Sequence, residues 1–263
     1  MQKLFDVIFE DADLLVLNKP AGLVCHPTKN GEMSSLIGRV RLHLQKTISR
    51  EGREEDSKLL TCNPQPSTAH LVNRLDRETG GVVVVAKNSA AAGELGKILE
   101  SRSVEKEYLA IVHGHVAAEQ GTIDAPLGKD ERSRVAIKDC VRPDGVAAQT
   151  DFVVERRFSR QSTINHQLST FTLLRIKPRT GRKHQIRIHL AHLGHPIVGD
   201  KIYGGDEDLY LALVEDRLTP EQRARLILPH HALHASGIKF FWRGAERIFA
   251  APPEAWFTDF VAG

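Results

Sequence analysis

The stretch His70–Lys87 restricts the fold of this chain more than any other, and within it the apolar run Val82–Ala86 follows a Gly-Gly pair. Four consecutive β-branched residues in so short a run predict a strand that is buried on both faces. Charged residues stand directly before it, namely Arg74, Asp76, Arg77 and Glu78. A rigid strand beside a polar loop can hold one carboxylate in a fixed position. Asp76 is therefore the first candidate for a catalytic group.

The string Arg74–Gly81, read as Arg-Leu-Asp-Arg-Glu-Thr-Gly-Gly, resembles the signature of the RluA-type RNA pseudouridine synthases. These enzymes isomerise uridines in ribosomal and transfer RNA, and the resemblance implies that Asp76 is the essential catalytic carboxylate. Many members carry His where Asn73 stands and Ser where Gly80 stands. Neither departure changes the aspartate, so we interpret both as adjustments of the loop. On composition alone, a charged run of this kind is more often a solvated loop.

A proline-containing string and a strand tyrosine support the same resemblance. Residues 18–27, Asn-Lys-Pro-Ala-Gly-Leu-Val-Cys-His-Pro, resemble a family stretch that lines the cleft beside the catalytic loop, and we assign its lysine no chemistry. Residues 104–112 predict a strand, in which alternation places Lys106, Tyr108 and Ala110 on one face. The resemblance implies that Tyr108 stacks on the target uracil, whereas a strand tyrosine by itself is more often a half-buried core residue.

The longest match to the family covers residues 173–204. From Arg175 through Arg187 it has six Lys or Arg residues and no acid. It contains Thr-Gly-Arg-x-His-Gln-Ile-Arg-x-His and Gly-x-Pro-x-x-Gly-Asp-x-x-Tyr-Gly, nearly position for position, which implies that Arg187 pairs with Asp76. A helix should follow Thr180-Gly181, whose free N–H groups would suit a phosphate.

Contacts with RNA are expected from a small set of basic residues. The set comprises Arg74, Arg77, Arg182, Lys183 and His184. The resemblance implies that Arg74 fills the gap left by a flipped-out uridine. Leu233 belongs to a Leu-His-Ala string that also resembles the family, which implies that it packs on the base opposite Tyr108. Helical spacing places His184 on the same face as Arg187. Because the net charge is only +3, the positive charge has to gather on one face.

The chemistry implied by the resemblance breaks the N1–C1′ bond of uridine, rotates the base and rejoins it through C5. Asp76 has to be ionised for this, and a buried Arg187 opposes the rise in its pKa that burial would cause. The residues do not decide whether Asp76 attacks the nucleoside or abstracts a proton. We expect no metal and no organic cofactor. His189 and His192 invite a metal interpretation, which we reject because six nearby cations would repel a divalent ion.

The whole chain of 263 residues predicts an α+β fold, a largely antiparallel mixed sheet split by a central cleft with flanking helices. Shorter expectations are a hairpin over 7–17 around an acidic turn, helices over 34–45 and 88–102, a polar loop over 46–67 and a meander over 113–170. Asn88-Ser89 offers an N-cap for the second helix. We expect one catalytic domain over 1–263 with no preceding S4-type RNA-binding domain, and a monomer. An odd cysteine count, an acidic N-terminal segment and the lack of a long apolar run predict a cytoplasmic protein without membrane contact.

Two other functions stay open at this point. A protein that binds RNA without turnover would have no use for Asp76, Tyr108 and Arg187 together. A nucleoside glycosidase generally needs two carboxylates, and only Asp76 stands out. An RNA pseudouridine synthase acting on structured ribosomal or transfer RNA is therefore the leading prediction.

Overall fold

The computed structural model describes residues 5–27, 31–51, 68–161 and 168–263. The chain divides into two compact units, a first unit of Met1–Val104 with Lys239–Pro252 and a second unit of Glu105–Ile238 with Pro253–Gly263. The single domain over 1–263 and the central cleft stay predictions.

In the first unit, the valine run forms the expected buried strand. Strand β4 (Gly80–Ala86) is buried at every residue and pairs antiparallel with β2 (Leu14–Lys19), which in turn pairs with β1 (Asp6–Glu10). Short β3 (His70–Leu71) also pairs with β4, and β12 (Ala245–Ala250) pairs with β11 (Leu233–Trp242). The predicted hairpin over 7–17 is confirmed. The side chain of Asp11 accepts the N–H groups of Asp13 and Leu14 at 2.9 and 2.7 Å and so fixes its turn.

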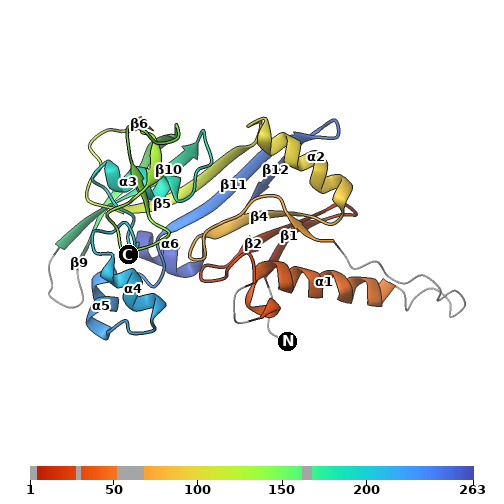
Figure 1. The fold of residues 1–263 in the computed structure, drawn as a ribbon, viewed down its shortest axis with the longest axis horizontal. Coiled ribbons are helices and arrows are strands. Elements are labelled where there is room, and N and C mark those ends of the chain that lie inside the picture. The colour runs from red at the N-terminus through yellow and green to blue at the C-terminus, as the bar shows by residue number, and fades with distance from the viewer. Residues whose placement is uncertain (1–4, 28–30, 52–67, 162–167) are drawn as a thin grey trace, which may run out of the picture. The chain divides into compact units, whose positions relative to one another are not determined.

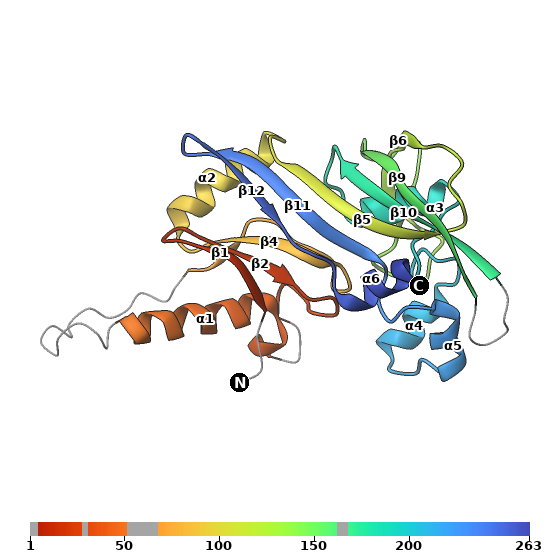
Figure 2. The same ribbon diagram turned by 180° about the vertical axis from the view of Figure 1, so that it is seen from behind.

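Helices α1 (Leu36–Glu51) and α2 (Ser89–Glu100) lie on opposite sides of these strands, which explains why β2 and β4 are covered on both faces (Figures 1 and 2). A single 3₁₀ turn, η1 (Glu32–Ser34), precedes α1. Asn88 caps α2 as expected, because its side chain accepts the N–H of Ala91 at 2.9 Å. The prediction of a loop from residue 46 is wrong for 46–51, which continue α1, and 52–67 lie outside the described residues.

The second unit is built on a longer antiparallel sheet with the order β11-β5-β10-β9-β6. Its strands are β5 (Glu105–His113), β6 (Gln120–Asp124), β9 (Gln149–Gln161), β10 (Leu168–Pro178) and the first part of β11. A separate pair joins β7 (Leu127–Lys129) and β8 (Asp139–Val141). The antiparallel pairing expected for residues 113–170 is confirmed.

Among the described residues of this unit, four helices accompany the sheet: α3 (Gln185–His192), α4 (Asp208–Val214), α5 (Pro220–Leu226) and α6 (Ala255–Ala262). Helices α4 and α5 lie side by side (Figure 2) and share a small apolar cluster of their own. The main core of the unit joins β5, β9 and β10 to Ile186 and Leu190 of α3. In the described part of the chain, no helix has both the length and the apolar character needed to span a bilayer.

Candidate active site

The loop that carries Asp76 leads directly into β4. Asn73 is buried; its side-chain amide donates to the carbonyl of Val82 at 3.0 Å and accepts the N–H of Val84 at 2.8 Å. The side chain thus takes the place of strand backbone opposite β4. The carbonyl of Asp76 accepts the N–H of Thr79 at 3.2 Å, which closes a turn at the start of β4, and the Asp76 side chain is partly buried.

A buried lysine binds the backbone next to Asp76. The Lys19 ammonium is fully enclosed and donates to the carbonyls of Pro20, Leu23 and Arg77 at 3.0, 2.8 and 3.1 Å. Hydrogen bonds from a charged donor are stronger than those between neutral groups. Lys19, to which we assigned no chemistry, therefore ties the segment after β2 to the residue that follows Asp76.

The carbonyls on both sides of Asp76 accept hydrogen bonds from this same segment. Gly22, whose φ of 86° favours glycine, donates its N–H to the carbonyl of Arg77 at 2.9 Å. The thiol of buried Cys25 donates to the carbonyl of Leu75 at 3.4 Å. The backbone position of Asp76 is thus set by residues more than fifty positions earlier in the chain.

Tyr108 lies in the second unit, on the sheet face that α3 covers. The predicted strand is β5, and Tyr108 stands opposite Ile176, which stands opposite Phe152. Thr150 follows on the same face, and its hydroxyl binds the side chains of Gln185 and His189 of α3, each at 2.9 Å. Tyr108 is partly buried against the main core of the unit. It therefore packs as a core residue on one side.

Arg187 forms a buried ion pair with Asp200, a residue that sequence reasoning missed. The Nε and Nη2 atoms of Arg187 meet the two carboxylate oxygens at 2.6 and 2.9 Å, and the side chains are 6% and 0% exposed. Asp200 also accepts the N–H groups of Ile202 and Tyr203. Burial alone would raise the pKa of Asp200, but the charge and hydrogen bonds of Arg187 hold that pKa far below its usual value.

Tyr203 completes this cluster. The guanidinium of Arg187 lies 5.0 Å from the centre of the Tyr203 ring, and the hydroxyl of Tyr203 lies 2.9 Å from Nδ1 of His184. Burial raises the pKa of the Tyr203 phenol, so the hydroxyl stays protonated. His184 precedes α3 with a φ of 53°, so the prediction that it shares a helix face with Arg187 is wrong, although both side chains meet Tyr203. Asp200 and Tyr203 both belong to the matched Gly-Asp-x-x-Tyr-Gly string, which was the available signal.

The prediction of an open helix start at Thr180-Gly181 is wrong. Helix α3 begins at Gln185, and the Gln185 side chain accepts the N–H of Arg182 at 3.0 Å and the hydroxyl of Thr180 at 2.7 Å. The side chain of Gln185, the first residue of the helix, therefore occupies the position at which we expected a phosphate. Lys183 also has a partner inside the protein, since its ammonium lies 2.8 Å from the Asp139 carboxylate while remaining half exposed.

The remaining predicted residues divide by exposure. Arg74 and Arg77 are exposed, and Arg74 forms no ion pair or hydrogen bond within the described ranges. Leu233 is 5% exposed and belongs to the main core of the second unit. His189 uses both ring nitrogens inside the protein, on the hydroxyl of Thr150 and on a backbone carbonyl. It is thus not arranged as a metal ligand.

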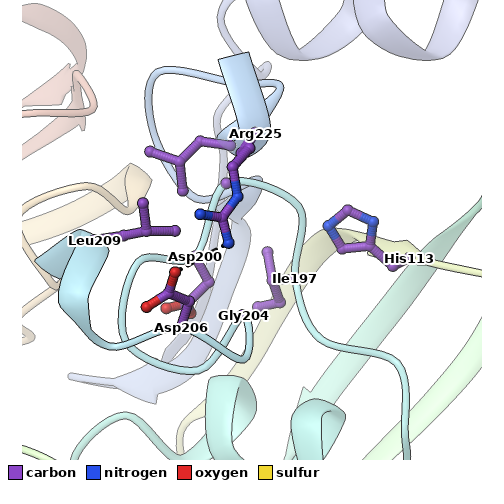
Figure 3. Close-up of a pocket in the computed structure, with 9 residues that line it drawn as sticks. His113, Ile197, Asp200, Gly204, Asp206, Leu209 and Arg225 are labelled. Atoms are coloured by element: carbon purple, nitrogen blue, oxygen red, sulfur yellow. Dashed lines mark hydrogen bonds and ion pairs between the residues drawn. The ribbon is translucent and has the colours of Figure 1, made fainter. Parts of the chain in front are cut away.

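A pocket of the second unit lies against Asp200 (Figure 3). Its lining comprises His113, Ile197, Gly199, Asp200, Gly204, Asp206, Leu209, Arg225 and Leu226. Arg225 reaches Asp206 at 3.0 Å, so the charged side chains of this wall neutralise each other. The lining includes neither Tyr108 nor Arg187. Asp76 belongs to the first unit and both of these to the second, so the pairing of Asp76 with Arg187 stays a prediction.

Two solved human structures have this fold. RNA Pseudouridylate Synthase Domain Containing 4 is 25% identical, with a TM-score of 0.68 over 98% of this chain and 92% of that one. RNA Pseudouridylate Synthase Domain Containing 1 is 23% identical, with a TM-score of 0.69 over 96% and 86%. The α+β fold with a mostly antiparallel sheet is therefore confirmed.

Sequence comparison defines the family. The RNA pseudouridylate synthase family model matches residues 13–192, a range that contains Asp76, Tyr108 and Arg187. This chain belongs to that family, and the RluA-type resemblance is confirmed.

Curated relatives are longer than this chain. An uncharacterized RNA pseudouridine synthase of Bacillus subtilis, YhcT, is 35% identical over 204 residues, which are 78% of this chain and 59% of that protein. Ribosomal large subunit pseudouridine synthase D of Xanthomonas campestris is 36% identical over 249 residues, or 94% and 65%. The chain spans about 60% of the length of the relatives that it matches.

Proposed function

We propose that this chain is an RNA pseudouridine synthase, an isomerase that converts specific uridines of structured ribosomal or transfer RNA. The observation that carries the proposal is the Arg-Leu-Asp loop, in which the carbonyls before and after Asp76 are both bonded to the 19–25 segment. A chain that belongs to this family and fixes that loop so firmly has the means to position one carboxylate. The relatives named as ribosomal large subunit enzymes favour ribosomal RNA as the substrate.

In this proposal Asp76 acts on the nucleoside and Tyr108 stacks on the uracil. Arg187 keeps Asp76 ionised by charge pairing. The edge of the guanidinium formed by Nε and Nη2 binds Asp200, and the same guanidinium is assigned to the Asp76 carboxylate. A planar guanidinium with five donors can serve two carboxylates in this way. Asp200 and Tyr203 then act as positioning residues for Arg187.

The RNA contributes a flipped-out uridine, whose removal from the stack costs a few kcal/mol. Arg74 is assigned to the vacated gap, which fits a side chain that is exposed and has no partner within the described ranges. The isomerisation is neither a redox reaction nor a hydrolysis, and we assign it no cofactor. We propose that the reaction takes place in the cytoplasm, as the sequence predicts.

The test is tritium release from RNA labelled at C5 of uridine, because C5 loses its hydrogen when the base is rejoined through that carbon. The substrate is ribosomal RNA from a strain that lacks the gene, in which the target uridines are unmodified. Asp76→Asn should abolish release. Asp216→Asn is the matched control, since Asp216 is exposed and its φ of 55° suits asparagine. Normal release by Asp76→Asn would contradict the proposal.

The same assay separates the two alternatives. Free uracil as the labelled product would indicate a glycosidase. Tight RNA binding without any tritium release by the unaltered protein would indicate a binding protein. Sequencing the RNA of the deletion strain for lost pseudouridines then identifies the target position.

A further inference from the structure

Lys106 is the one cation of the Tyr108 face for which the described structure offers no partner. Lys106 and Tyr108 stand two residues apart on β5, so both side chains project to the face that carries α3. Two residues along a strand span about 7 Å. The Lys106 side chain is partly buried, and it forms neither an ion pair nor a hydrogen bond with any described residue.

Cations on the opposite face of the same sheet are arranged differently. Arg175 binds Glu107 and Glu155, and Lys177 lies 3.7 Å from Glu107. Farther along the chain, Arg179 lies 2.6 Å from Asp151. These charges are neutralised within the protein although they are more exposed to water. An ammonium that loses part of its water without gaining an acid carries an uncompensated cost.

We propose that Lys106 binds a backbone phosphate of the nucleotide whose base stacks on Tyr108. The inference rests on the proposed function, because it takes Tyr108 as the platform for the base. A nucleotide places its base and its phosphate on either side of one sugar, a separation comparable with that between Lys106 and Tyr108. A phosphate supplies the negative charge that no described side chain provides to Lys106, and a lysine binds a phosphate as a point charge.

The electrostatics around Lys106 agree with this assignment. Burial lowers the pKa of its ammonium, which shows that no carboxylate compensates the lost hydration. The adjacent acids Glu105 and Glu107 project to the other face by strand alternation. A phosphate held there would favour the charged form of Lys106 and would contribute directly to RNA affinity.

The experiment compares Lys106→Gln and Lys106→Arg with Lys177→Gln. Lys177 is the matched control, since it is a lysine of the same sheet on the opposite face, 59% exposed. RNA affinity is measured by fluorescence anisotropy on ribosomal RNA from the deletion strain over a range of salt concentrations. Lys106→Gln should weaken binding at least about tenfold, as expected for a charged hydrogen bond. It should also reduce the slope of log affinity against log salt by about one.

Lys106→Arg should keep most of the affinity, and Lys177→Gln should leave both quantities unchanged. The thermal midpoint of Lys106→Gln should equal or exceed that of the unaltered protein, because an unpaired charge has been removed. An unchanged salt slope in Lys106→Gln, or an equal change in Lys177→Gln, would overturn the proposal. If Lys106→Gln does not fold, Lys106→Met provides the same comparison.

The two proposals fail in different ways. If both hold, Asp76→Asn should abolish tritium release and leave the RNA affinity and its salt slope unchanged. A protein that releases no tritium and still loses affinity with Lys106→Gln would contradict the enzyme while keeping the phosphate contact.

Discussion

Arg187 and Asp200 form a two-point ion pair inside the second unit, with Nε and Nη2 of the guanidinium at 2.6 and 2.9 Å from the carboxylate oxygens. Asp200 also accepts backbone N–H groups at 2.9 and 3.0 Å, so the carboxylate cannot turn independently of its loop. The guanidinium is therefore oriented before any RNA arrives, and substrate binding does not have to order it.

Asp200→Asn should lower the free energy of unfolding by about 3–5 kcal/mol, because the change leaves a buried guanidinium without its counter-charge. Urea denaturation measures the loss. Asp206→Asn is the control, since the Arg225–Asp206 pair is more exposed and should contribute about 0–1 kcal/mol. Equal stability of Asp200→Asn and the unaltered protein would mean that the pair is not structural.

Substitutions of Tyr203 should lower the free energy of unfolding by an amount that depends on how much of the side chain is removed. Tyr203→Phe keeps the ring beside the guanidinium and removes the hydroxyl that meets His184, which should cost about 1 kcal/mol. Tyr203→Ala also removes the buried ring and should cost about 3–5 kcal/mol. Tritium release should follow the same order, with Tyr203→Phe retaining most of kcat. A loss of tritium release in Tyr203→Phe as large as that in Tyr203→Ala would assign the hydroxyl a direct part in the reaction.

Lys19→Met should lower the free energy of unfolding by at least about 2 kcal/mol, because the buried carbonyls of Pro20, Leu23 and Arg77 lose a charged donor. Chemical denaturation is again the measurement, and exposed Lys97→Met is the control. Tritium release per folded molecule should fall as well, since the loop beside Asp76 loosens. Full activity in a destabilised Lys19→Met protein would separate the lysine from the position of Asp76.

Acidification should weaken the fold through His189, which is buried, and His113, which is partly buried. Burial lowers the pKa of His189 and of His113, so below an unfolded value of about 6.5 the unfolded chain binds more protons than the folded one. Stability is then complete above that pH and decreases as the pH falls toward the folded values. His189→Gln should flatten this dependence between pH 7.5 and 5.5, as measured by urea unfolding. Exposed His26→Gln should leave it unchanged.

Local pattern was enough to predict much of the fold. The valines of β4, the acidic turn at Asp11 and the Asn88 cap act within a few residues, so the sequence displays them directly. The end of α1 was missed although Ile48 continues the spacing of Val40 and Leu44. The polar residues around Ile48 predicted a loop, because one apolar position alone is a weak indication of a helix.

The sequence motifs of the site could be recognised from the sequence, but the contacts between their side chains could not. Asp76, Tyr108 and Arg187 came from the resemblance. Asp200, the partner of Arg187 within the second unit, was not predicted, because a carboxylate in a loop is normally exposed. Lys19 was missed for the same reason, since burial of a lysine depends on carbonyls that converge only in the folded chain. The hydrogen bonds of Gln185 with Thr180 and Arg182 were missed because they depend on where α3 begins, which the sequence pattern did not show.

The thiol of Cys25, buried against the carbonyl of Leu75, gives this protein an internal reporter. Alkylation requires the sulfur to reach solvent, which happens only when the neighbouring backbone detaches. The labelling rate of Cys25, compared with that of the more accessible Cys140, therefore counts the opening events of the segment that holds Asp76. Slower labelling on addition of RNA would mean that the substrate further stabilises the closed position of this segment, which the fold already holds in place.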